Sequence, residues 1–135
     1  MAANEEVVRN LIAASPYGRL LGLVLESVER DRVCVRLPFR TEVVTIGDVV
    51  HGGALASLVD TAATGAFWSG ADLSASSRGT TIGFTINFLA AARAKDVVAQ
   101  ARVIQRGRTI CVGEVEVSDC DGAAVARALV TYKLG

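Results

Sequence analysis

One stretch decides the fold of this chain: residues 51–69 read HGGALASLVDTAATGAFWS. Apolar residues recur there at the spacing of one helix face, namely Leu55, Leu58, Val59, Ala62 and Ala66. The opposite side carries small or uncharged residues and one carboxylate, Asp60. A helix that is apolar or small nearly all round is a buried helix. The stretch therefore predicts one long helix at the centre of the protein.

Shorter elements lie on both sides of this helix. A short helix is predicted after Asn4, with acidic residues in its first turn, and it ends before Pro16. Alternating apolar patterns predict strands over residues 20–28, 33–37, 80–89, 96–105, 108–118 and 123–133. Most connections are short, as at the Asp121-Gly122 turn, which implies an antiparallel sheet. The sequence therefore predicts a single α+β domain over residues 1–135, in which the sheet wraps the long helix.

The composition excludes several functional classes. The formal net charge is zero, so the chain offers no broad basic surface for nucleic acid. Charges or glycines interrupt every long apolar run, which argues against a membrane span. The segment Asn4-Glu5-Glu6 is acidic where a signal peptide would be basic, so we expect a cytoplasmic protein. Hydrophobic residues make up 51% of this short chain, which favours an oligomer.

Several catalytic motifs are absent from the sequence. There is no Gly-x-Ser-x-Gly elbow for a serine hydrolase, and no glycine-rich loop for a dinucleotide or a phosphate. His51 is the only histidine, and the three cysteines lack the spacing of metal ligands. We therefore expect neither a metal nor a cofactor.

Asp60 is the one carboxylate of the predicted central helix. Burying an unpaired ion is costly, so its presence calls for a reason. One explanation is structural, with the charge meeting a backbone amide or an arginine across an interface. The other is catalytic, since a carboxylate held partly away from water is a stronger base. We favour the catalytic interpretation.

Gly52 and Gly53 stand at the start of the same helix. The first amides of a helix have no partners inside it and lie at the positive end of the helix dipole. Glycine lets a substrate approach such amides closely, so the segment suits an oxyanion hole. An ordinary loop-to-helix junction is the alternative, and the lone carboxylate in the same helix tips the balance towards catalysis.

The spacing of the two groups indicates how they act together. The nine positions from His51 to Asp60 correspond to about 13 Å along a helix axis. That is too far for the Gly52 amide and Asp60 of one helix to act on the same carbonyl. If both act on one substrate, each site combines Asp60 of one subunit with Gly52 of another.

The run from His51 to Ala62, followed by Thr85-Ile86-Asn87-Phe88-Leu89, resembles the hotdog-fold acyl-CoA thioesterases. Within that superfamily it is most similar to the phenylacetate-degradation branch. The resemblance extends from about Gly18 to the C-terminus and includes Gly107-Arg108. It implies a hotdog fold, a homodimer or a homotetramer built as a dimer of dimers, and hydrolysis of an acyl-CoA to a free acid and CoA.

The resemblance also implies roles for single residues. Asp60 is expected to be the general base or the nucleophile, and the Gly52 amide is expected to polarise the thioester carbonyl. His51 is expected to position that loop. Thr81 matches a position where a hydroxyl often orients the attacking water.

Further residues are predicted to bind the substrate: Gly53, Arg106, Gly107, Arg108 and Phe67. The basic turn at 106–108 suits the phosphates of CoA, with ordinary solvated loop charges as the alternative. Phe67 is a candidate wall of an acyl pocket, with a plain core position as the alternative. Members of the branch often carry an Asn before the HGG run, where this chain has Val44 or Thr45. A polar contact near the leaving sulfur is therefore expected to differ.

Two other functions stay open at this stage. Residues 47–51 superficially resemble the pattern of hotdog hydratases, although the Asp-to-His spacing is shorter and the Asn-Pro pair is absent. An enoyl-CoA hydratase or dehydratase is therefore one alternative, and a non-catalytic acyl-CoA-binding module is the other. The acyl group, the pathway and the choice between dimer and tetramer are also left open.

Overall fold

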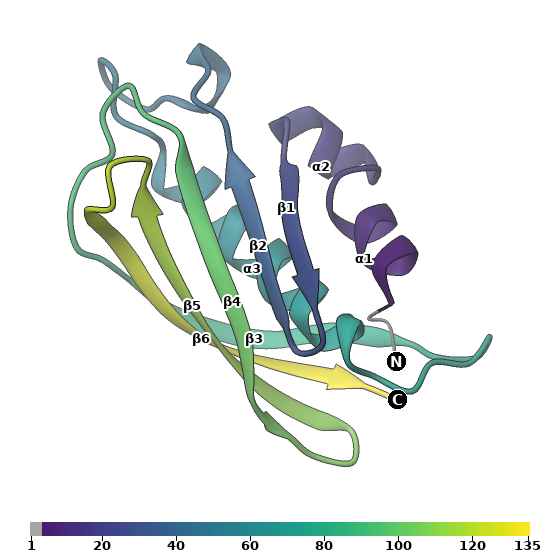
Figure 1. Ribbon diagram of the computed structural model, residues 1–135. Helices are drawn as coiled ribbons and strands as arrows, with labels where there is room; N and C mark the ends of the chain where they lie inside the picture. Colours follow the sequence, from purple (N-terminus) through teal and green to yellow (C-terminus); the bar gives the residue numbers. More distant parts are fainter. Residues whose placement is uncertain (1–3) are drawn as a thin grey trace.

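The structure is a computed structural model that describes residues 4–135 (Figure 1). In chain order its elements are α1 (Glu5–Ile12), α2 (Pro16–Leu21), β1 (Val24–Glu29), β2 (Arg32–Leu37), the 3-10 turn η1 (Thr41–Val43), α3 (Gly52–Ser69), β3 (Gly79–Phe88), β4 (Val97–Arg106), β5 (Ile110–Asp119) and β6 (Ala124–Leu134). The strands form one six-stranded sheet in the order β1-β2-β4-β5-β6-β3, and every neighbouring pair is antiparallel. The sheet wraps around α3, which confirms the predicted α+β architecture with its long central helix and short N-terminal helix (Figure 1).

α3 is buried because its surface is almost entirely apolar or small. Leu58, Val59 and Ala62 are fully buried, and the helix packs against β2, β4, β5 and β6. The strands often present alanine to the helix, as at Ala99 and Ala126, and these short side chains let the sheet approach closely. The predicted helix over residues 51–69 is confirmed, with position 51 as its N-cap. Within residues 4–135 no helix is both long enough and apolar enough to cross a membrane.

α1 lies across α3 at Gly65. An added Cβ at Gly65 would lie 2.5 Å from Ile12 Cδ1, so glycine lets the Ile12 side chain pack directly against the α3 backbone. Asn4 occupies the N-cap position of α1, but its side chain does not cap that helix. Its Nδ2 instead donates hydrogen bonds of 2.8 and 2.9 Å to the carbonyls of Trp68 and Ala71, which ties the start of α1 to the end of α3.

The predicted strand over residues 20–28 is wrong in its first part. The segment Pro16–Leu21 forms α2, because proline stands in the first turn and the Ser15 hydroxyl accepts a 3.1 Å hydrogen bond from the Gly18 amide. Gly22 then ends the helix with a φ of 72°, which glycine adopts without strain. β1 therefore begins only at Val24.

β3 is an edge strand whose outer side has no neighbour among residues 4–135. Large apolar side chains along it are exposed to 58% at Ile82, 37% at Phe84 and 51% at Phe88. The whole strand contains no charged residue. Natural proteins rarely leave such an edge open, because its free N–H and C=O groups pair with other chains.

Candidate functional site

Asp60 lies in the middle of α3 and is half-buried. Its Oδ1 accepts a 2.7 Å hydrogen bond from the Thr81 hydroxyl in β3. No other donor within residues 4–135 is bonded to this carboxylate, so Oδ2 is open to a water or a ligand. α3 and β3 thus bring together two predicted catalytic residues that are 21 positions apart in the chain.

A row of polar side chains continues from Asp60 along α3. Thr64 and Trp68 follow at intervals of four residues, which places all three on one face of the helix. Trp68 Nε1 donates a 2.9 Å hydrogen bond to the hydroxyl of Tyr132 in β6. Burial raises the pKa of the Tyr132 hydroxyl, and the charge of Asp60 acts in the same direction. The hydrogen bond that this hydroxyl accepts from Trp68 acts in the opposite direction and lowers the pKa of Tyr132.

Tyr132 is a residue of this region that the sequence does not single out, since an aromatic residue in an alternating strand looks like any core residue. Its ring fills the space beside Gly79, where an added Cβ would lie 2.5 Å from the hydroxyl oxygen. The same ring stacks on Phe67 with 5.0 Å between the ring centroids, and Phe67 is fully buried. Phe67 therefore occupies a plain core position, the alternative interpretation of this residue from the sequence. Its part in binding an acyl group stays a prediction.

His51 is the N-cap residue of α3. Its Nδ1 accepts a 2.7 Å hydrogen bond from the Gly53 amide. An added Cβ at Gly53 would lie 2.9 Å from that Nδ1, so the cap itself requires glycine at this position. The Gly53 amide is thus engaged by the cap rather than open to a substrate, and His51 fixes the geometry of the helix start.

The Gly52 amide has a different environment. No backbone acceptor for it occurs within residues 4–135, and Gly52 lines a pocket of about 360 Å³. An added Cβ at Gly52 would meet the Phe88 ring at 3.4 Å, an ordinary contact, so the fold does not require glycine here. Glycine instead leaves space above a free amide at the positive end of a helix, which is an arrangement that stabilises a developing oxyanion.

The side chains that line the pocket beside Gly52 are almost all apolar, and its polar surface comes mainly from the backbone. Its lining residues are Thr45, Val49, Val50, Gly52, Leu55, Phe88, Leu89, Ala90, Ala91 and Ala92. They come from the segment before α3, from the first turn of α3 and from the end of β3 with the residues that follow. None of them is charged, and Thr45 supplies the one side-chain hydroxyl among them. The pocket therefore suits an apolar group.

α3 keeps the two halves of the predicted site apart within one chain. Gly52 and Asp60 are separated by eight residues of continuous helix, or about 12 Å along its axis. Gly52 lies beside Phe88 at the end of β3, whereas Asp60 is bonded to Thr81 near the start of that strand. The two ends of β3 thus mark the two halves of the site.

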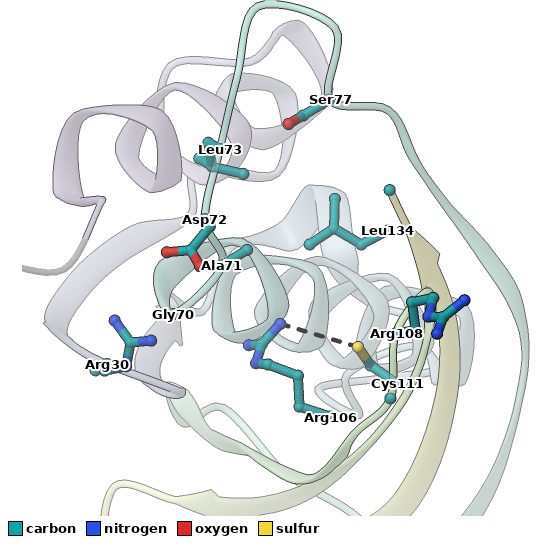
Figure 2. A pocket seen from close by; sticks show the side chains of 12 residues that line it. Arg30, Gly70, Ala71, Asp72, Leu73, Ser77, Arg106, Arg108, Cys111 and Leu134 are labelled. Carbon is teal, nitrogen blue, oxygen red and sulfur yellow. Dashed lines mark hydrogen bonds between the residues drawn. The ribbon is translucent and has the colours of Figure 1, made fainter.

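A second pocket, of about 260 Å³, lies at the opposite end of α3, and Figure 2 shows Arg30, Arg106 and Arg108 around it. Arg106 Nη2 donates a 2.6 Å hydrogen bond to Asp31 Oδ1 and a 3.0 Å hydrogen bond to the Phe67 carbonyl. A cation at the last turn of a helix is favoured by the helix dipole. Arg106 is therefore held in a structural contact, whereas Arg108 is exposed at the pocket.

Gly107 forms the turn between β4 and β5. Its amide donates a 2.9 Å hydrogen bond to the Ile110 carbonyl, and an added Cβ would lie 2.5 Å from that oxygen. The turn itself thus accounts for glycine at this position. Its predicted contact with a substrate stays a prediction, although Gly107 does line the pocket with Arg106 and Arg108.

Known proteins resemble this chain in sequence. A family model described as the thioesterase superfamily matches residues 47–126. The protein SSO2140 of Saccharolobus solfataricus, which is named as an esterase, is 28% identical over 130 residues. That match covers 96% of this chain and 89% of the archaeal protein.

Solved structures share the fold. The conserved protein PA5202 from Pseudomonas aeruginosa has a TM-score of 0.81 at 33% identity, covering 90% of this chain and 94% of that one. A hypothetical thioesterase from Streptococcus pneumoniae, solved with coenzyme A, has a TM-score of 0.74 at 24% identity over 84% of this chain and 85% of that one, a likeness of fold alone. Since the family match spans more than half of its length, the chain belongs to the thioesterase superfamily.

Proposed function

We propose that this protein hydrolyses the thioester bond of an acyl-CoA to a free acid and CoA. One observation carries the proposal: Thr81 holds one oxygen of Asp60 and leaves the other open. A positioned carboxylate can serve as the base, and the free Gly52 amide at the helix start can serve as the oxyanion donor. The superfamily supports thioester chemistry, and the coenzyme A in the Streptococcus pneumoniae structure supports the substrate class.

A dimer formed through β3 would complete the site. In an antiparallel pair of identical strands, a two-fold axis at Phe84 sets residue 88 of one copy opposite residue 80 of the other. Thr81 with Asp60 of one subunit then lies beside Phe88 with Gly52 of the second, and the dimer contains two such sites. The uncharged and exposed edge of β3 supports this pairing.

The proposed hydrolysis uses these two groups in turn. The open oxygen of Asp60 accepts a proton from water while the water oxygen bonds to the carbonyl carbon. The charge that develops on the carbonyl oxygen is stabilised by the Gly52 amide of the second subunit. The C–S bond then breaks, and the sulfur takes the proton from Asp60 and leaves as the thiol. In the alternative course Asp60 attacks the carbonyl carbon itself, the C–S bond breaks, and CoA leaves as the thiolate. Water then hydrolyses the resulting anhydride, which releases the acid and restores the Asp60 carboxylate, and the proton given up by water goes to the thiolate.

For the CoA phosphates we propose the pocket at the far end of α3. Arg30 and Arg108 are exposed there and form no ion pair with the described residues. Both guanidinium groups are therefore available for phosphate oxygens, which arginine binds in a bidentate manner. Arg106 would contribute its charge while it stays bonded to Asp31.

Thiol release from a panel of acyl-CoAs tests the proposed function. Asp60→Asn keeps the shape of the side chain and removes the base, so its kcat is expected to fall by about 10²- to 10⁴-fold. Glu6→Gln changes an exposed carboxyl on α1, outside both pockets, and serves as the matched control. Wild-type turnover by Asp60→Asn would contradict the mechanism. Hydration of an enoyl-CoA without thiol release would identify a hydratase, and tight binding without turnover a binding module.

We also propose that the protein belongs to the phenylacetate-degradation branch of the superfamily, that residues 1–135 form a single domain, that the assembly is a dimer or a dimer of dimers, and that the protein is cytoplasmic.

A further inference from the structure

We propose that the pocket beside Gly52 binds the acyl group of the substrate, and that this group is uncharged, apolar and of limited size. The inference rests on the proposed function, in which the Gly52 amide marks the place of the carbonyl oxygen. The pocket of about 360 Å³ opens directly at that residue. A thioester carbonyl bears the acyl chain on one side and the sulfur on the other, so one of these two arms enters the pocket.

The chemistry of the lining selects the acyl arm. The pantetheine arm of CoA carries two amide groups, and burying an amide without hydrogen-bond partners is costly. Nine of the ten lining residues have no polar side-chain group, and Thr45 alone carries a hydroxyl. A hydrocarbon chain or ring needs no such partners and gains from contact with these walls.

The size of the pocket limits the acyl group. Pockets for small ligands span about 300–1,000 Å³, so this one lies near the lower end of the range. Val50 and Leu55 on the inner side are buried core residues, which fixes that wall. The pocket therefore fits a short to medium chain or a single ring, and it disfavours a chain that ends in a carboxylate.

Ala90 and Ala91 determine how much of the pocket volume is free, and they can be replaced by larger residues without disturbing the core. Both line the pocket and are exposed, whereas the neighbouring Ala92 is fully buried. A larger side chain at 90 or 91 therefore fills the pocket without displacing the core. We assign these two positions as determinants of acyl-chain length.

Hydrolysis of matched acyl-CoAs by the full chain tests the assignment. In the wild type, kcat/KM is expected to rise about threefold to fourfold for each methylene from acetyl-CoA until the pocket is full. Butyryl-CoA is expected to exceed succinyl-CoA, which has the same length and a terminal charge, by about tenfold or more. In Ala91→Phe the ratio of kcat/KM on octanoyl-CoA to kcat/KM on acetyl-CoA is expected to fall by about tenfold or more, because the larger side chain takes the space of the longer chain. Ala75→Phe, in an exposed loop outside the pocket, is the control.

Each contrary outcome has a distinct meaning. An equal loss on acetyl- and octanoyl-CoA in Ala91→Phe would place the pantetheine arm in the pocket. Undiminished octanoyl-CoA hydrolysis by both Ala90→Phe and Ala91→Phe would place the acyl group elsewhere. Absence of thiol release from every thioester would refute the proposed function itself. In that case, calorimetry with non-hydrolysable acyl thioether analogues of CoA still tests whether the pocket binds the acyl group. The affinity for the wild type must then rise with chain length, and Ala91→Phe must abolish that rise.

Discussion

Thr81→Val removes the hydrogen bond that holds Asp60 and leaves the shape of the side chain nearly unchanged. The bond measures 2.7 Å and runs from a hydroxyl to a carboxylate oxygen, which is the strong, charge-assisted kind. Hydrogen bonds to charged groups contribute about 1.5–3 kcal/mol, equivalent to about 10- to 150-fold in a rate if the full amount is used in the transition state. We therefore expect kcat of Thr81→Val to fall by that factor, because an unrestrained Asp60 is rarely in the productive orientation.

The measurement is steady-state thiol release, together with thermal unfolding of each variant. Thr85→Val provides the control, since Thr85 lies on the same strand, is exposed and has no bond to Asp60. We expect KM of Thr81→Val to stay near the wild-type value. The melting temperature is expected to fall by several degrees, because the same hydrogen bond is lost from the folded state, so activity is measured well below the unfolding transition of both proteins. An unchanged kcat, a loss that lies wholly in KM, or an equal loss of activity in Thr85→Val would each show that Thr81 does not position Asp60.

Three further outcomes follow from the same structure. Gly52→Ala should fold normally, because its Cβ meets the Phe88 ring at an ordinary distance of 3.4 Å. Its kcat/KM should fall by about tenfold or more, because the added methyl group crowds the free amide. Normal activity of this variant would show that the amide is not part of the site. Phe84→Lys places a charge on the exposed edge strand, so the variant should be monomeric in size-exclusion chromatography and inactive in the thiol-release assay. Leu129→Lys, on the neighbouring strand β6, should remain an active dimer. A Phe84→Lys variant that is both monomeric and active would exclude a site shared between subunits. Burial raises the pKa of Tyr132, so the unfolded chain loses this proton first above about pH 10 and wild-type stability falls there. In urea unfolding, the free energy of unfolding of Tyr132→Phe should therefore fall less between about pH 9 and pH 11 than that of the wild type. At neutral pH the variant should be less stable by about 1–3 kcal/mol, because the Trp68 N–H loses its acceptor.

Helix α3 illustrates what the sequence determines locally. Its apolar stripe repeats every three to four residues, and its N-cap contact joins His51 to an amide only two positions away. The turn at Asp121-Gly122 is equally local, with a φ of 89° at Gly122 and a 2.9 Å hydrogen bond from its amide to the Asp119 carbonyl. Signals of this kind act over a few residues, so they can be recognised without knowing the fold.

The start of the first strand was not recognisable in the same way. The leucines at 20 and 21 look like part of a strand because they precede further apolar residues. In the folded protein they complete α2, since Ser15 caps that helix and Gly22 ends it. The short apolar run fits either element, and the capping residues on both sides decide between them.

The position of Arg106 was decided by packing over a longer distance. In the sequence it belongs to a basic turn with Arg108, and nothing separates their roles. In the fold Arg106 turns to Asp31 and to the Phe67 carbonyl at the end of α3, whereas Arg108 stays exposed. Partners that are 75 and 39 positions away leave no trace in the local pattern.

The sequence by itself thus determined the central helix, its capped start and the lone carboxylate inside it, because residue type and spacing fix these features within a few turns of chain. Only the tertiary structure decided that Thr81 meets Asp60, that Tyr132 lies on the same polar row, and that β3 stands at the open edge of the sheet. These features depend on the order of strands and on side chains that approach from distant segments. The physical reason is that such contacts are set by how the whole core packs, and no local pattern encodes that packing.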